Sequence, residues 1–315
     1  MPNANRIIST EVQINLNLLS DYNKYEGNLD FTTKDSKGQA VLVSISLLNE
    51  MVTVKIPELN IDEELYQELN NTLDQSYFLD QRTTDKVLAM FGEMREAADS
   101  VLSIIKYHLK HYSIPETFGS YKSMKWGDSL ETLHHVRGTY YGNLITVFDN
   151  FSHRRIDAEW QGFVQSALDA KIEPLLAMRH LHRAKNEPHP HHKWIDATIA
   201  AELAVKEILI RKRPFLAEIL LEVPSPPLSK LYGKLSDHYL GARSPYVSKL
   251  QDGQTIRNEL VHRPASKKID AQKANDYVEM VSDAIFHLLS LVHPEDMLIR
   301  NSAPYVSSPD EIQQS

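Results

Sequence analysis

The chain has 315 residues, of which 42% are hydrophobic and 24% are charged. These values are typical of a globular protein that is long enough for two or three domains, each with its own core. The formal net charge of -8 argues against a protein whose whole surface binds nucleic acid, because Lys and Arg supply most of the affinity for phosphate groups. The lack of cysteine excludes disulfides, Cys-based metal sites and a thiol nucleophile.

Two features of the sequence predict a cytoplasmic protein. No stretch approaches the roughly 18 uninterrupted apolar residues of a membrane span. The first five residues lack the basic and apolar regions of a signal peptide. We therefore expect a protein that acts in the cytoplasm and has no membrane partner.

Residues from about 6 to 57 predict a small antiparallel sheet. The even positions from 8 to 18 hold five apolar side chains and Thr10, and polar side chains occupy the odd positions between them, so a strand here would have one apolar face and one face in solvent. Residues 41–47 and 52–56 predict two more strands. We assign residues 1–60 to a small antiparallel β domain.

After Pro57 the apolar residues recur every three or four positions, which is typical of amphipathic helices. Helices are expected at about 87–109, 130–151 and 156–167. Residues 61–168 therefore predict a helical middle region.

The last third of the chain predicts a four-helix bundle at residues 169–293, with a long connection at its centre. Proline-containing breaks separate the expected helices, which run from about 171 to 185, 193 to 212, 244 to 263 and 269 to 292. Residues 294–315 are rich in Ser, Pro, Asp and Gln and are expected to be disordered. The predicted fold class is α+β, mostly α.

The hexapeptide Arg257-Asn258-Glu259-Leu260-Val261-His262 carries side chains suited to phosphodiester cleavage. Imidazole moves a proton near neutral pH, and guanidinium holds a phosphate by two parallel hydrogen bonds. Chance alone would give about two such Arg-to-His patterns in this composition, and the sequence contains two. The other runs from Arg183 to His189 across a loop broken by prolines, which leaves its geometry unconstrained.

The match at Arg257 lies late in a predicted helix that Pro264 ends. In a regular helix, five residues leave Arg257 and His262 about 140° apart, so one helix would not aim both at a single phosphate. Either the helix unwinds there, or a second copy of the motif completes the site across a dimer. Leu260 and Val261 would supply the buried side.

Glu202 lies in an apolar stretch of small residues on the second helix of the bundle, and two interpretations are open. It could form an exposed pair with Lys206, four residues later. It could instead face the bundle interior and orient Arg257 or His262. The basic residues after the motif are likewise open to two interpretations, a solvated loop or an RNA-binding segment, and they are Arg263, Lys267 and Lys268.

Five histidines near the proline-containing loop suggest a metal site, because imidazole is a common zinc ligand; they are His180, His182, His189, His191 and His192. However, the first two project to different sides of a helix, and no carboxylate follows at a matching interval. We expect a solvated histidine loop and no bound metal.

The region from about 170 to 293 resembles the HEPN superfamily. The resemblance rests on the R-x4-H pattern of Arg257 and His262, the polar Asn258, the Ala-Ala-Glu-Leu-Ala-Val-Lys stretch at residues 200–206, and a long apolar helix that closes the bundle. HEPN domains are four-helix bundles, and many are metal-independent ribonucleases of toxin, CRISPR-associated and antiphage systems. In those enzymes two copies of the motif meet across a dimer.

The resemblance implies an RNA substrate, a homodimer, no cofactor, and an antitoxin or sensor partner. His262 would act as general base or acid when a ribose 2′-hydroxyl attacks the adjacent phosphate. Arg257 would stabilise the developing charge, Asn258 would orient the phosphate, and Glu202 would match an acidic residue of some members. Pro264 stands where certain toxin members carry a modified tyrosine, so control by such modification is not expected. The alternative is a non-catalytic module that binds nucleotide, RNA or protein.

Overall fold

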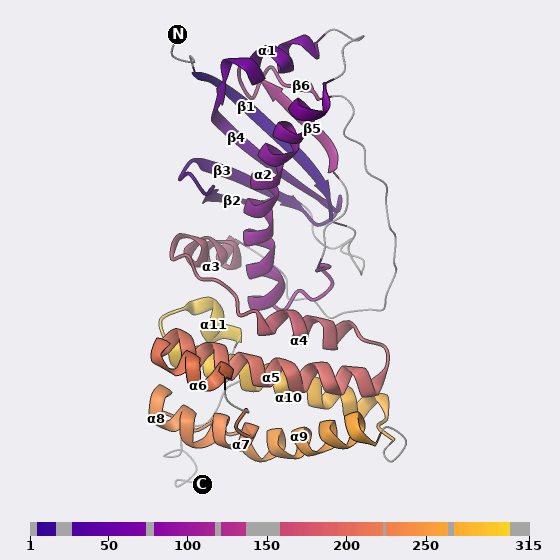
Figure 1. The fold of residues 1–315 in the computed structure, drawn as a ribbon, viewed down its shortest axis with the longest axis vertical. Coiled ribbons are helices and arrows are strands. Elements are labelled where there is room, and N and C mark those ends of the chain that lie inside the picture. The colour runs from indigo at the N-terminus through magenta and orange to yellow at the C-terminus, as the bar shows by residue number, and fades with distance from the viewer. Residues whose placement is uncertain are drawn as a thin grey trace. The chain divides into compact units, whose positions relative to one another are not determined.

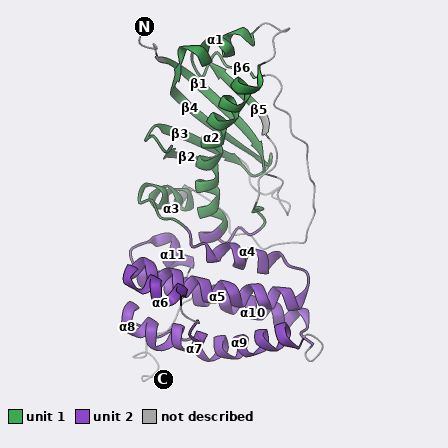
Figure 2. Cartoon of the chain, in the orientation of Figure 1, with its two compact units in different colours: residues 1–106, 113–173 green, residues 107–112, 174–315 purple. Residues whose placement is uncertain are grey.

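The computed structural model describes residues 5–16, 27–73, 79–116, 121–136, 158–222, 225–263 and 268–302. Contacts between Cα atoms divide the chain into two compact units (Figure 2). The first comprises residues 1–106 and 113–173, and the second comprises residues 107–112 and 174–315. Within the described residues, the first unit contains a sheet with three helices, and the second is helical (Figure 1). The expected mixed α+β fold class is confirmed.

The first unit is built on a six-stranded antiparallel sheet with the strand order β2-β3-β4-β1-β5-β6. Its strands are β1 (Asn5–Asn15), β2 (Leu29–Lys34), β3 (Ala40–Ser46), β4 (Met51–Asp62), β5 (Tyr121–Gly127) and β6 (His134–His135). The three predicted strands correspond to β1, β3 and β4. The sheet also takes in β5 and β6 from the region that was expected to be helical.

The alternation predicted that the polar face of β1 lies in solvent, but part of this face is buried. Ser9 and Glu11 on that face are only 3% and 6% exposed. Glu11 lies opposite Lys55 of β4 and Lys125 of β5, and its carboxylate pairs with their ammonium groups at 3.3 and 2.7 Å. Burial alone would raise the pKa of Glu11, but these hydrogen bonds and charges outweigh it, and the pKa lies below its ordinary value.

Three helices accompany the sheet, namely α1 (Glu63–Asn71), α2 (Gln81–His108) and α3 (Ala158–Asp169). The prediction of helices at 87–109 and 156–167 is confirmed, although residues 107 and 108 belong to the second unit. Along α2, Val87, Phe91 and Met94 are fully buried. The Thr10 hydroxyl of β1 donates to Met94 Sδ at 3.5 Å, so α2 covers the apolar face of the sheet (Figure 1).

The outer edge of β2 is bonded to side chains of α3. Thr32 donates its amide to Gln165 Oε1 at 3.0 Å, and Gln165 Nε2 donates back to the Thr32 carbonyl at 2.8 Å. Gln161 Nε2 donates to the Asp30 carbonyl at 2.7 Å. Two glutamine side chains therefore satisfy backbone groups that an edge strand leaves without a neighbour.

The helix predicted at 130–151 is wrong for residues 130–136. The Thr132 amide donates to the Ser129 carbonyl at 3.1 Å and closes a turn, after which His134 and His135 pair with β5. Strand pairing there overrides a helical spacing that few apolar residues support. Residues 137–151 lie outside the described ranges.

The second unit contains α4 (Ala177–Asn186), α5 (Pro190–Lys212), α6 (Ala217–Glu222), α7 (Leu228–Lys230), α8 (Ser236–Leu240), α9 (Val247–His262), α10 (Ala271–Val292) and α11 (Met297–Ser302). The four predicted helices correspond to α4, α5, α9 and α10. The 3-10 helix η1 (Pro214–Leu216), α6, α7, the π-helix η2 (Leu231–Leu235) and α8 lie in the connection between α5 and α9. Of the helices in the described ranges, none combines the length and the apolar character that crossing a bilayer requires.

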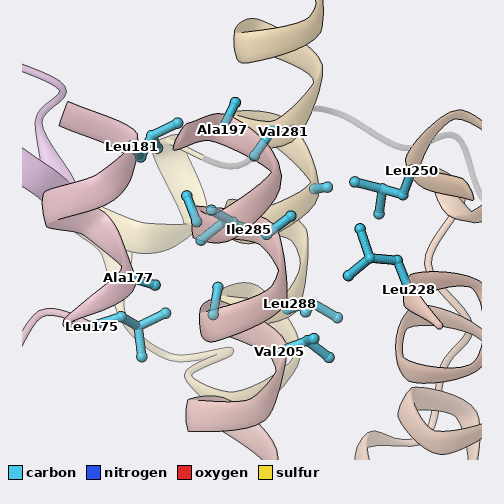
Figure 3. Packing of buried hydrophobic residues seen from close by; sticks show 14 of the residues in the cluster. Leu175, Ala177, Leu181, Ala197, Val205, Leu228, Leu250, Val281, Ile285 and Leu288 are labelled. Carbon is cyan, nitrogen blue, oxygen red and sulfur yellow. The ribbon is translucent and has the colours of Figure 1, made fainter. Parts of the chain in front are cut away.

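Helix α5 packs against α4, α9 and α10 and forms the centre of the second unit. Ala200, Ala201 and Ala204 on it are fully buried, and such small side chains let neighbouring helices approach closely. Figure 3 shows Leu228 of α7 facing Leu250 of α9 within the same buried cluster. The apolar residues of the second unit thus form one core.

Helix α11 lies in the segment that was expected to be disordered. Leu298 and Ile299 are fully buried. Asp296 Oδ1 accepts their amides at 2.9 and 3.1 Å and caps the helix. The prediction of disorder from Pro294 is therefore wrong for Met297–Ser302, because two apolar side chains and a capping aspartate are enough to order one short helix. Residues 303–315 lie outside the described ranges.

Candidate functional site

Helix α9 carries the three residues of the motif, Arg257, Asn258 and His262, and is regular over all of them. It ends at His262, and the next amide, that of Arg263, still donates to the Glu259 carbonyl at 2.7 Å. The helix therefore does not unwind between Arg257 and His262, which removes one of the two ways in which a single site could form.

The buried side of the motif is narrower than expected. Leu260 is 4% exposed and packs in the core, whereas Val261 is 47% exposed. The expectation that both supply the buried side is wrong for Val261, because consecutive residues of a helix point about 100° apart. Val261 and the neighbouring His262, which is also exposed, thus present an apolar and a titratable side chain together at the end of α9.

Arg257 is half-buried and has only part of its hydrogen-bonding capacity satisfied. Its Nη1 donates to Asn258 Oδ1 at 3.1 Å. Its Nε is buried and has no hydrogen-bond partner among the described residues. A guanidinium offers five N–H donors, so Arg257 keeps the capacity to bind an anion.

Glu202 of α5 lies close enough to Arg257 for their charges to interact. Its carboxylate pairs with Lys206 Nζ at 2.9 Å, and the two side chains are 26% and 15% exposed. Burial alone would raise the pKa of Glu202. Hydrogen bonds from Ser225 and Lys206, together with the charges of Lys206 and Arg257, outweigh it and hold the pKa below its ordinary value.

Both interpretations of Glu202 are therefore partly right. The pair with Lys206 forms, but it is largely buried and does not lie on an exposed face. The carboxylate also acts on Arg257, as the interior-facing interpretation requires. The negative charge of ionised Glu202 attracts the Arg257 guanidinium.

His262 lies on a different side of α9 from Arg257. Five residues of a regular helix separate the two side-chain directions by about 140°, and while Arg257 is half-buried, His262 is exposed. Within one chain the motif therefore supplies a phosphate-binding group and a proton-transfer group that face different directions.

The three predicted RNA-binding residues are not all described. Arg263 and Lys268 are exposed on the two sides of a gap in the description, and Lys267 lies within that gap. Exposed cations near His262 suit a surface that meets a phosphate backbone.

The competing match has a structural role at its arginine. Arg183 Nε donates to Asp196 Oδ2 at 2.7 Å, and Arg183 Nη2 bonds to the other carboxylate oxygen. Asp196 is 7% exposed, and the hydrogen bond raises the pKa of Arg183. His189 stands at the start of α5 as its N-cap residue. This bidentate pair joins α4 to α5, and it uses N–H donors of Arg183 that a substrate phosphate would need.

The histidines do not gather into a metal site. Within the ranges that the structure describes, no group of three or more His, Asp or Glu residues is arranged to hold a metal ion. His182, one of the five, is 3% exposed and packs edge-on against Tyr107 with ring centroids 6.3 Å apart. His182 therefore belongs to the core and not to a histidine loop.

Two residues beside the motif were not among those predicted from the sequence. Ser225, in the proline-rich connection, donates toward Glu202. Gln254, one turn before Asn258, accepts the Leu228 amide at its Oε1 at 2.9 Å and so fixes the start of α7. The helical spacing from Arg257 could have indicated Gln254, whereas only the folded chain brings Ser225 to the site.

Comparison of the chain with protein-family models, with curated proteins and with solved structures finds no match. The function must therefore be inferred from the geometry of α5 and α9 and from the residues that they carry.

Proposed function

We propose that the protein is a metal-independent endoribonuclease of HEPN type that acts as a homodimer. The observation that carries this proposal is the setting of the motif on α9. Arg257 is half-buried beside Glu202 with an unused buried donor, and His262 is exposed at the end of the same helix. Glu202 and Arg257 are thereby partly shielded from solvent, while the proton-transfer group is open to a large substrate.

The reaction needs one proton acceptor, one proton donor and an anion-binding group. His262 takes the proton of a ribose 2′-hydroxyl, whose oxygen forms a bond to the adjacent phosphorus while the bond from phosphorus to the 5′-oxygen breaks. The leaving 5′-oxygen takes up a proton from solvent water, and His262 returns the proton that it accepted to solvent. Arg257 and Asn258 hold the phosphate oxygens as their charge rises. RNA is the substrate because the nucleophile is its 2′-hydroxyl.

The regular course of α9 favours a second chain in this site. Since one helix separates Arg257 and His262 by about 140°, a phosphate held by Arg257 of one copy is better served by His262 of another. Exposed Val261, next to His262, offers an apolar surface for that contact. A two-fold arrangement would bring two motifs together and form two equivalent sites.

The test is cleavage of single-stranded RNA in the presence of EDTA. We expect cleavage by the native protein, no cleavage of DNA of the same sequence, and a loss of at least about a hundredfold in Arg257→Ala and in His262→Ala. His192→Ala, which changes another exposed histidine, is the matched control. Cleavage that persists unchanged in both motif variants would show that the motif does not carry the reaction.

Mixing the two inactive variants tests the shared site. If Arg257 and His262 come from different chains, a mixed dimer of Arg257→Ala and His262→Ala has one intact site. Random exchange should then restore about a quarter of the native activity. A site formed within one chain would stay inactive in every mixture.

The alternative function is a non-catalytic module that binds nucleotide, RNA or protein. The charge interaction between half-buried Arg257 and Glu202 favours it, since such an arginine also suits simple anion binding. This module would bind RNA without cleaving it, and Arg257→Ala would weaken binding while His262→Ala would not.

We further propose that the protein acts in the cytoplasm in toxin-like growth arrest or antiphage defence, and that an antitoxin or sensor partner restrains it. A ribonuclease of this kind would stop growth when it is expressed without its partner. Cells that express the His262→Ala variant should grow normally, and equal growth with both proteins would count against this role.

A further inference from the structure

A buried aromatic contact joins three helices of the second unit close to the motif. Trp194 of α5 stacks on Tyr277 of α10 with ring centroids 3.9 Å apart and planes at 9°. The two side chains are 4% and 5% exposed. Trp194 Nε1 donates to the carbonyl oxygen of Gly253 on α9 at 3.0 Å. The indole thus contacts α10 through its face and α9 through its N–H group.

Gly253 brings the backbone of α9 against the Tyr277 ring. A Cβ atom at this position would lie 2.2 Å from Tyr277 Oη and 2.3 Å from Cε2, so only glycine permits the approach. The Tyr277 hydroxyl is 3.0 Å from Thr198 Oγ1, and Thr198 donates its own proton to the Trp194 carbonyl at 2.9 Å. The end of the Tyr277 ring that meets Gly253 is therefore also held by a hydrogen bond to Thr198.

The Gly253 carbonyl belongs to the helical turn that leads into the motif. In an α-helix the carbonyl of one residue accepts the amide of the residue four positions later, and here that residue is Arg257. The Trp194 N–H group is thus a second donor to the oxygen that anchors the Arg257 backbone. It fixes the rotation of α9 about its axis at the turn from which Arg257 and Asn258 project.

We propose that Trp194 is a positioning residue for Arg257 and Asn258, acting through the Gly253 carbonyl. The reaction that it serves rests on the proposed ribonuclease function, whereas its effect on the position of Arg257 does not. Trp194 itself touches neither the phosphate nor the proton-transfer group. Its contribution is the direction in which the two phosphate-binding side chains point.

The test removes only the N–H group. Benzothienylalanine in place of Trp194 keeps the shape of the bicyclic ring but has a sulfur atom where the indole has its donor. Thr198→Val is the matched control, because it removes both buried hydrogen bonds of the Thr198 hydroxyl from the same cluster and keeps the Trp194 donor that bonds to Gly253. Trp194→Phe serves as an additional variant that is simpler to make.

The first readout is the NMR resonance of the Arg257 Nε–Hε group, which reports the position of this buried donor independently of any reaction. The second is the kinetics of RNA cleavage. We expect the resonance to shift in the benzothienylalanine variant only, with kcat reduced roughly tenfold or more and KM changed less than about twofold.

Each outcome bears on one of the two proposals. A resonance that stays in place, or that shifts equally in Thr198→Val, overturns the positioning role of Trp194. A selective shift in a protein whose native form cleaves no RNA supports the positioning role and refutes the ribonuclease. A selective shift together with the selective loss of kcat supports both.

Discussion

His108 is a buried residue whose ionisation near neutral pH changes when the chain folds. Its side chain is 1% exposed, and its Nδ1 has no hydrogen-bond partner within the described part of the chain. Burial lowers the pKa of His108 from 6.5 to about 4, although the charge of Asp296 acts in the other direction. The folded protein therefore holds a neutral imidazole where the unfolded chain would be charged.

This difference predicts a loss of stability in mild acid. Between pH 6.5 and about 4 the unfolded chain binds a proton that folded His108 does not, so the free energy of unfolding falls as the pH falls through this window and levels off below it. Since a tenfold change in proton affinity corresponds to about 1.4 kcal/mol, the loss should approach roughly 3 kcal/mol.

Urea unfolding at several pH values measures this slope. His108→Asn should flatten it, because asparagine does not titrate in this range. His192→Asn, which changes an exposed histidine, should leave the slope as it is. Equal slopes for the native protein and His108→Asn would show that His108 is not its source.

At the level of residues, the sequence predicted that Arg257 and His262 point in different directions, but it did not predict the side chains around them. Arg257, Asn258 and His262 stand out because their chemistry is specific, and the spacing of five residues predicted that they diverge on a regular helix. The effect of Ser225 on the pKa of Glu202 could not be predicted, since these residues lie 23 positions apart and the connection between them has no repeating pattern. The chemistry of a side chain can be read from its position in the sequence, whereas the groups that stabilise the charge of Glu202 come together only in the folded chain.

Two glycines inside helices show how differently elements tolerate the same change. On α9, Gly253 lies against Tyr277, and an added methyl group would overlap the ring. On α2, a Cβ atom added at Gly92 would have open space around it. In the described structure, no heavy atom outside the neighbouring residues and the backbone of the helix itself lies within 4 Å of it. The first glycine allows two helices to meet, and the second has no such contact.

Alanine at these two positions should change stability in opposite directions. Gly253→Ala should destabilise the second unit by about 1 to 3 kcal/mol through overpacking. Gly92→Ala should stabilise the first unit by up to about 1 kcal/mol, because alanine favours a helix interior over glycine. Thermal unfolding of both variants provides the measurement, and a stabilising effect of Gly253→Ala would contradict the close contact with Tyr277.

Long elements were predictable because their pattern repeats. Val87, Phe91 and Met94 begin an apolar stripe that extends over several turns of α2, and all three are buried. The short strand β6 was not predictable, because two residues carry no period and their structure comes from pairing with β5. The same holds for α11, where burial of Leu298 and Ile299 decides the structure.

At the scale of the molecule, a site shared between two chains makes activity depend on assembly. If RNA cleavage requires a dimer, dilution below its dissociation constant should lower the activity per chain. Substituting exposed Val261 with Glu should move this threshold to higher protein concentration, because a charge would replace an apolar contact at the proposed interface.

Cleavage rates over a dilution series, together with sedimentation of the same samples, give the measurement. Leu42→Glu, at a similarly exposed apolar residue on the sheet of the first unit, is the control and should leave the threshold unchanged. Activity per chain that is constant from fully dimeric to fully monomeric samples would exclude a shared site.

The glutamines of α3 have a consequence for how the first unit can associate. A side-chain amide carries both N–H donors and a carbonyl acceptor, and Gln165 presents one N–H group and its carbonyl oxygen to Thr32, as a peptide group would. Side chains of α3 therefore bond to backbone groups of β2 that a neighbouring strand would otherwise use. The sheet ends at that edge although its hydrogen bonding continues, so another chain that tried to extend it there would first have to compete with a side chain that is already bound.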